Sequence, residues 1–142
     1  MVLKEALRFL INMVVNGHYN TDPNLVSKIC SLCVEAYTIQ VDEETLDVTL
    51  FALSLISQHF ENHGLILEQS SILDILAQRI SSVQRIGNAS YLMDFIMNLS
   101  YNSDFHDALM AYKIIQLSYQ IFSSLDEHGH TSLVTIISHL IE

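Results

Sequence analysis

The sequence predicts an all-helical fold in which short helical units stack on one another as an α-solenoid. Three observations support this: apolar residues recur at helical spacing, the helical pattern itself repeats about every 43 residues, and no segment is a convincing strand. The repeat is plainest in Leu10–Asn16 and Ile96–Asn102, with Leu53–Ser57 halfway between them. Since one such repeat cannot bury its own apolar faces, neighbouring repeats must cover them.

Capping and breaking residues place the expected helices. Asp22 before Pro23 is a strong start signal, because the carboxylate can cap a helix whose first residue is proline. Asp104 and Thr131 are the expected caps of the last two helices, and Asp126–Gly129 is an expected loop. The predicted helices, about seven in number, span residues 2–16, 24–38, 42–60, 65–82, 89–101, 105–123 and 131 onward.

Composition favours a protein partner. Of the 142 residues, half are apolar and only 15% are charged, so the chain can bury a substantial core. The 16 acidic and 6 basic residues give a formal net charge of -10. That charge disfavours nucleic acid, whose binding depends on neutralising phosphates, and favours basic proteins or peptides. No apolar run approaches a membrane span or a secretory leader, so we expect no membrane association and a cytoplasmic or nuclear protein.

The order of the segments resembles a known repeat family. Thr49–Ser57 followed by Asn62–Leu76 is similar to the third helix, polar turn and following two helices of an armadillo repeat, and Tyr91–Tyr119 is similar to the next copy. The resemblance to armadillo proteins of the importin-α and β-catenin type spans essentially the whole chain. It implies a right-handed solenoid domain over residues 1–142, with about three repeats and a partial fourth, belonging to a longer solenoid. HEAT-like and other α-solenoid repeats are the alternatives, because the motif is mostly apolar spacing.

The resemblance also implies a binding groove lined by the third helices. In that family an asparagine on each third helix holds the main chain of an extended peptide, since an amide both donates and accepts hydrogen bonds. The resemblance places Asn12 and Asn98 at this position, while Leu55 interrupts the series and His139 falls where the next asparagine would be. The plainer interpretation is that these residues are polar positions on a solvated face.

One departure from the family changes the expected ligand. Importin-type grooves carry tryptophans one turn earlier, which hold lysine side chains. This chain has no tryptophan, and the corresponding positions are Arg8, Phe51 and Asp94. Recognition of a basic nuclear-localisation signal in the usual way is therefore not expected.

We expect a non-enzymatic interaction scaffold that binds a peptide or protein segment, without cofactor or metal. The expected contact residues are Arg8, Asn12, Asp94, Asn98, Tyr101 and His139. The alternative is a structural segment that stacks on further repeats or on a second copy of itself. Its end face would be apolar residues expected to face water, namely Ile136, Ile137, Leu140 and Ile141.

Other chemistries are weakly supported. Cys30 and Cys33 have redox-motif spacing, but they fall inside an apolar helix, so we expect them to be buried and reduced. His59 and His63 lie one helical turn apart without the glutamate position of a metalloprotease motif. Neither a phosphate-binding loop nor a serine-nucleophile elbow occurs, so no catalytic residue is assigned.

Overall fold

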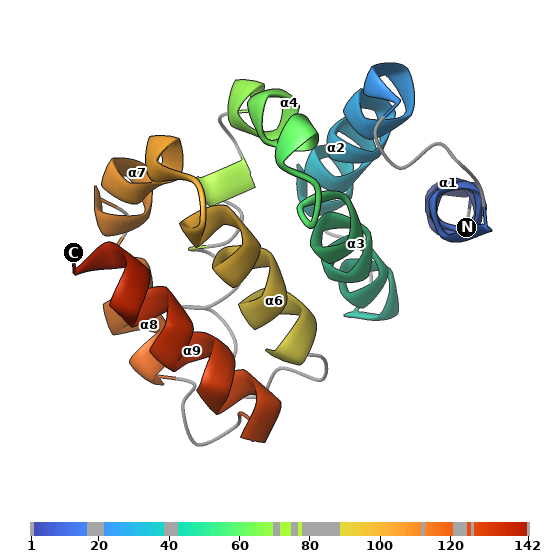
Figure 1. Ribbon diagram of the computed structural model, residues 1–142. Coiled ribbons are helices and arrows are strands. Elements are labelled where there is room, and N and C mark those ends of the chain that lie inside the picture. The colour runs from blue at the N-terminus through green and yellow to red at the C-terminus, as the bar shows by residue number, and fades with distance from the viewer. Residues whose placement is uncertain are drawn as a thin grey trace. The chain divides into compact units, whose positions relative to one another are not determined.

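The computed structural model describes residues 2–16, 22–38, 43–69, 72–74, 77, 89–111, 113–120, 125 and 127–141 (Figure 1). Within these ranges every regular element is a helix, which confirms the all-helical prediction. The contacts group the chain into two compact units, Met1–Ile72 and Leu73–Glu142, which are described in turn.

The first unit is a cluster of helices around α2. Its elements are α1 (Val2–Asn16), α2 (Pro23–Thr38), α3 (Glu43–Ile56), the 3-10 turn η1 (Phe60–Asn62) and α4 (His63–Glu68). α2 packs against α1, α3 and α4, and α1 also packs against α3. Along α3 every side chain from Thr45 to Ile56 is buried or half-buried, as its apolar residues on all sides predict. The fully buried core includes Leu7, Val26, Ile29, Leu50, Leu53 and Ile66.

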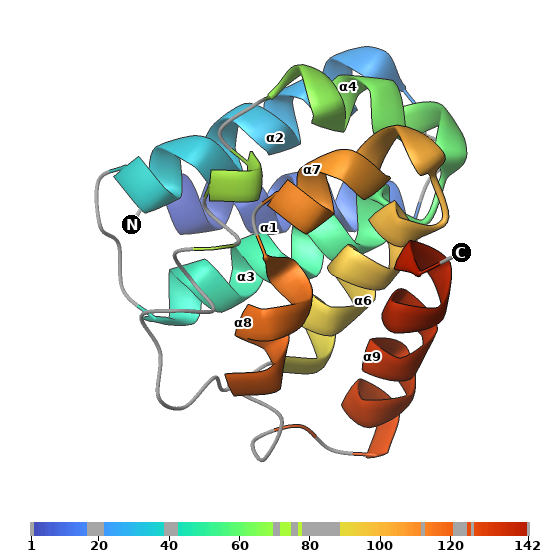
Figure 2. The ribbon, with the colours of Figure 1, turned by 90° about the vertical axis from the view of Figure 1, so that its left-hand side faces the viewer.

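The second unit is built around two helices that lie side by side. Its elements are α6 (Ala89–Ser100), the 3-10 turn η2 (Ser103–Phe105), α7 (His106–Ala111), α8 (Ile114–Gln120) and α9 (Glu127–Leu140). α6 packs along α9, and α8 contacts both α7 and α9 (Figure 2). The fully buried core includes Leu92, Phe95, Ile96, Leu99, Phe105, Leu109, Ile114 and Ile136.

The start of α2 is the one that the sequence predicts. Asp22 Oδ1 accepts hydrogen bonds from the backbone N–H groups of Asn24 at 2.9 Å and Leu25 at 3.3 Å. N–H groups in the first turn of a helix have no carbonyl partner within that helix, and Pro23 has no N–H group. The Asp22 carboxylate therefore accepts the hydrogen bonds that these two N–H groups would otherwise lack.

Two other predicted caps are wrong. The capping residue is Asn102, whose side chain accepts a hydrogen bond from the Asp104 N–H at 3.0 Å. It lies earlier than predicted because the 3-10 turn η2 precedes α7. Thr131 lies inside α9, where its hydroxyl donates to the Glu127 carbonyl at 3.1 Å. Residues 127–129 of the expected loop belong to α9, and Asp126 lies outside the described residues.

Two predicted helices are broken and one ends early. α3 ends at Ile56 and not at Phe60. The predicted helix 65–82 is interrupted at Gln69, whose φ of -88° and ψ of 76° are not helical. The predicted helix 105–123 is interrupted at Lys113, which has a φ of 56°. The described part of the chain therefore has shorter and more numerous helices than the sequence predicts.

The corner that follows α3 recurs after α6 at the predicted spacing of about 43 residues. In both places a 3-10 turn leads directly into a short helix, η1 into α4 and η2 into α7. The residue before each turn is extended, with φ -106° and ψ 118° at His59 and φ -103° and ψ 115° at Asn102. The repeat seen in the sequence is thus present in the backbone of this corner.

The two corners also share their hydrogen bonds. Ser57 and Ser100 each donate their hydroxyl to the carbonyl three residues earlier, at 3.1 and 2.6 Å. His63 Nε2 contacts the Ser57 carbonyl at 2.7 Å, and His106 Nε2 contacts the Ser100 carbonyl at 2.6 Å. Because a carbonyl only accepts, both rings must carry a proton on Nε2. Each histidine thereby satisfies a carbonyl at the end of the preceding helix.

Candidate peptide-binding surface

Two of the predicted contact residues lie on one face of α6, and a third, Tyr101, directly follows this helix. Asp94, Asn98 and Tyr101 are separated by four and three residues, which places them along one side of a helix. Asp94 and Asn98 are half-buried, whereas Tyr101 is 64% exposed at the C-terminal end of the helix. α9 packs beside this helix. These three positions, which are predicted as contact residues, therefore follow one side of α6 and its C-terminal end.

His139 joins this set from α9. Its ring centroid lies 4.3 Å from that of Tyr101, at an interplanar angle of 54°. Its Nδ1 lies 2.8 Å from Ser100 Oγ, whose proton is already directed to the Met97 carbonyl. His139 Nδ1 must therefore donate, which leaves Nε2 as the acceptor nitrogen of the neutral ring. The structure brings Tyr101 and His139 together at one end of the α6 and α9 pair, and Asn98 lies three residues before Tyr101.

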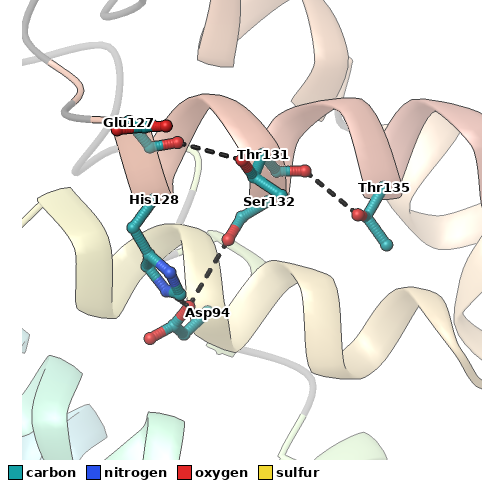
Figure 3. A network of polar contacts seen from close by, with 6 residues as sticks. All are labelled: Asp94, Glu127, His128, Thr131, Ser132 and Thr135. Carbon is teal, nitrogen blue, oxygen red and sulfur yellow. Dashed lines mark hydrogen bonds and ion pairs between the residues drawn. The ribbon is translucent and has the colours of Figure 1, made fainter.

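The other end of this helix pair is held by a polar cluster (Figure 3). His128 Nε2 lies 2.7 Å from Asp94 Oδ1, and Ser132 Oγ donates to the same oxygen at 3.5 Å. Since Asp94 meets the start of α9 and Tyr101 meets its end, α6 and α9 run parallel. The side chain of His128 is 59% exposed and that of Asp94 is 29% exposed, so this pair adds at most about 1 kcal/mol.

The cluster contains the residue types of a hydrolytic triad but not its geometry. In a triad the histidine stands between the serine and the carboxylate and takes the serine proton. Here His128 and Ser132 reach the same oxygen of Asp94, so the serine hydroxyl is directed to the carboxylate. The arrangement joins two helices and does not activate a nucleophile.

His128 and Ser132 are not among the site residues that the sequence predicts. His128 falls in the stretch expected to be a loop, whereas it occupies the first turn of α9. The spacing of four residues between His128 and Ser132 is the only local signal that they share a helix face. Their common partner on α6 is a long-range contact that no local pattern contains.

Arg8 and Asn12 lie on α1 in the first unit. Arg8 Nη2 is 2.7 Å from Glu44 Oε1, and Lys4 Nζ is 3.3 Å from Glu44 Oε2, so one carboxylate on α3 pairs with two cations on α1. Asn12 is exposed one turn after Arg8. Arg8 is thus part of the contact between α1 and α3, a role that the resemblance did not indicate.

The predicted end face on α9 needs one correction. Ile136 is completely buried and belongs to the core of the second unit, so it cannot form part of an exposed surface. Ile137 and Leu140 are half-buried, and Ile141 is 71% exposed. The exposed side of α9 also carries Val134, which is 66% exposed.

The two cysteines are buried and neither is in a disulfide, as predicted. Cys33 Sγ lies 3.8 Å from the Thr49 carbonyl, which it approaches across the α2 and α3 contact. Burial raises the pKa of Cys30 from 9.0 to about 12. Burial, with a smaller effect of Cys30, raises the pKa of Cys33 well above 9.0. Thiolates are the reactive form, so both side chains are inert at neutral pH.

We expect the cysteines to make the protein less stable in alkali. Above about pH 9 the unfolded thiols ionise while the folded ones stay protonated, so the free energy of unfolding falls by about 1.4 kcal/mol per pH unit per cysteine. This continues until the folded thiol ionises, near its pKa of about 12 for Cys30. Urea unfolding of the native protein and of Cys30→Ala, compared at about pH 8 and about pH 10, should show a smaller loss in the variant. An equal loss of unfolding free energy in both proteins would contradict the claim that the Cys30 thiol is buried and stays protonated.

Metal and membrane sites are not found in the described part of the chain. Among those residues no three or more histidine, cysteine, aspartate or glutamate side chains are grouped so that they could hold a metal ion. His63, one of the two histidines in the weak metal pattern, donates Nε2–H to the Ser57 carbonyl instead. None of the described helices combines the length and apolarity needed to cross a bilayer.

Comparison of the chain with models of protein families, with curated proteins and with solved structures gives no match. The side chains described on α6 and α9 form one continuous candidate surface of the second unit. We call this arrangement the α6–α9 surface, defined by Asp94 and Asn98 on α6, Tyr101 directly after it, and His139 on α9.

Proposed function

We propose that the chain is a non-enzymatic interaction scaffold that binds a peptide or protein segment along the α6–α9 surface. The observation that carries this proposal is the contact between Tyr101 and His139 at one end of two parallel helices, with Asn98 three residues before Tyr101. A surface of this kind offers polar groups and an exposed aromatic ring at a seam between helices, which suits an extended partner.

The chemistry of the three side chains fits a polypeptide main chain. The Asn98 amide can donate to a carbonyl and accept from an N–H group, so it can bind a peptide unit without selecting its side chain. His139 offers an acceptor nitrogen, and Tyr101 offers a large apolar ring with a polar tip. The net charge of -10 favours a partner segment that carries basic residues.

The proposal extends to an armadillo-like α-solenoid, with HEAT-like repeats as the alternative. Three features support it: the corner repeats at about 43 residues, the pairs α1 with α3 and α6 with α9 are in contact, and α6 runs parallel to α9. In such a solenoid α1, α3, α6 and α9 are successive third helices. By the resemblance, Asn12 holds on α1 the position that Asn98 holds on α6.

We expect Asn98→Ala to weaken peptide binding by up to about tenfold. The amide contributes hydrogen bonds to ligand backbone that are each worth about 0.5 to 1.5 kcal/mol net. The ligand would be a peptide selected from a random library displayed on phage against the whole chain. Its affinity for the native protein and for Asn98→Ala would be measured by fluorescence anisotropy.

The matched control is Asn24→Ala, which removes an exposed asparagine from the first turn of α2. It should leave the affinity unchanged, and circular dichroism should show that both variants keep the helical content of the native protein. Equal binding by all three proteins would reject the α6–α9 surface as the binding site.

The second candidate is a structural segment that associates through the outer sides of its helices. It is favoured by exposed apolar side chains on α1 and α9: Phe9, Val15, Val134 and Ile141 are between 58% and 71% exposed. Leaving such area in water costs about 25 cal/mol per Å². Light scattering at micromolar concentration separates the two candidates, since only the second requires an assembly larger than one chain.

A further inference from the structure

The first unit carries an exposed apolar stripe on η1 and α4. Phe60 is 67% exposed and Leu67 is 42% exposed. Gly64 lies between them, four residues after the first and three before the second, so the three positions share one side of the helical segment. A side-chain carbon added at Gly64 would meet nothing within 4 Å, so the surface between the two side chains is open.

The repeated corner shows that the fold does not require this stripe. At the spacing of about 43 residues, Ser103 takes the place of Phe60 and Asp107 takes the place of Gly64 on the same backbone. Gly64 has no positive φ that would demand glycine. Glycine inside a helix costs about 1 kcal/mol relative to alanine, and here neither backbone conformation nor crowding explains it.

Phe60 is held in place although it is exposed. Its ring centroid lies 5.5 Å from that of His63, at an interplanar angle of 41°. His63 is buried and bonded to the Ser57 carbonyl, so it gives the aromatic ring a fixed neighbour. A large apolar side chain that is both exposed and oriented is typical of binding sites, because little entropy is lost when a partner covers it.

The charge beside the stripe indicates the chemistry of the partner. Glu61 and Glu68 are both exposed and lie seven residues apart, so they follow one edge of the stripe. From Ser57 to Glu68 the chain contains no lysine or arginine. The surface therefore combines two apolar side chains, an open space between them and an acidic edge.

We propose that Phe60, Gly64 and Leu67 form a docking site for an amphipathic helix of a partner protein whose polar side carries lysine or arginine. One large apolar side chain of the partner fills the space above Gly64, between Phe60 and Leu67. Basic side chains of the partner pair with Glu61 and Glu68. The partner helix lays its apolar side on this stripe, and the site is distinct from the peptide site proposed on the α6–α9 surface.

The test uses a synthetic peptide of leucine and lysine, arranged so that leucines repeat at helical spacing. A scrambled peptide of the same composition serves as the probe for charge attraction alone. Fluorescence anisotropy should give an affinity at least about tenfold higher for the helical arrangement, and Phe60→Ser should remove most of this difference. The serine variant is expected to fold, since serine occupies the equivalent position of the second corner.

The variant Gly64→Gln distinguishes a loss of peptide binding from a loss of protein stability. Glutamine is a better helix former than glycine, so this variant should be at least as stable as the native protein, yet it should bind the helical peptide about tenfold more weakly because its side chain fills the open space. Met110→Ser is the matched control, because Met110 is 49% exposed at the position equivalent to Leu67. It should bind like the native protein.

Three results would overturn the proposal. One is equal binding of the helical and scrambled peptides, and another is helical-peptide binding that Phe60→Ser and Gly64→Gln leave unchanged. The third is that the helical peptide fails to bind, while the native protein dimerises and Phe60→Ser abolishes the dimer. That result would mean that the stripe binds a second copy of the chain.

Discussion

Replacing Phe105 by alanine is expected to lower the free energy of unfolding by about 3 to 5 kcal/mol, the range for removing a buried aromatic ring. Phe105 is 1% exposed at the end of η2, directly before α7. Its removal leaves a cavity at the corner that follows α6. Urea denaturation followed by circular dichroism would measure the loss, with attention to separate transitions of the two compact units.

The matched control for this prediction is Tyr119→Ala. Tyr119 is a comparably large ring on α8 but is 66% exposed, so its removal should lower the free energy of unfolding much less than the removal of Phe105. Similar losses in the two variants would mean that Phe105 is not part of a packed core.

Replacing His63 by alanine is expected to cost about 1 to 3 kcal/mol, because it leaves the Ser57 carbonyl without the Nε2–H donor. His63 is 4% exposed, so water cannot easily replace that donor. His106→Ala should cost less, because His106 is only half-buried and water can reach the Ser100 carbonyl. Amide hydrogen exchange would report the change locally, as faster exchange in α4 for the first variant and in α7 for the second.

A rescue variant distinguishes the hydrogen bond from packing. Glutamine carries an amide N–H that can reach a nearby carbonyl, so His63→Gln should recover part of the protection that His63→Ala loses in α4. If the two substitutions accelerate exchange equally, the contribution of His63 is packing and the shared role of the two corner histidines is wrong.

Much of the helical framework follows from local sequence. Asp22 with Pro23 predicts the start of α2, because the cap involves residues only two and three positions away. The repeat of about 43 residues can be seen in the sequence because the two corners have apolar and polar residues in the same order and at the same spacing. The breaks at Gln69 and Lys113 carry no such signal, since neither residue type favours a break.

The candidate site could be predicted only where its residues share one helix. Helical spacing predicts that Asp94, Asn98 and Tyr101 share one face, and the family resemblance marks Asp94, Asn98 and His139 as contact positions. His128 and Ser132 reach Asp94 across a contact between helices, and Arg8 reaches Glu44 in the same way. The burial of Ile136 likewise depends on which side of α9 meets its neighbours, which local apolar spacing does not decide.

The central claim is that a partner segment binds along the α6–α9 surface, and nuclear magnetic resonance tests it most directly. The 15N-labelled protein would be titrated with the peptide selected from the displayed library. We predict that the side-chain amide signals of Asn98 shift together with the backbone signals of Tyr101 and His139, while those of Asn24 stay in place. Shifts confined to other surfaces, with the Asn98 amide unchanged at saturation, would contradict the account.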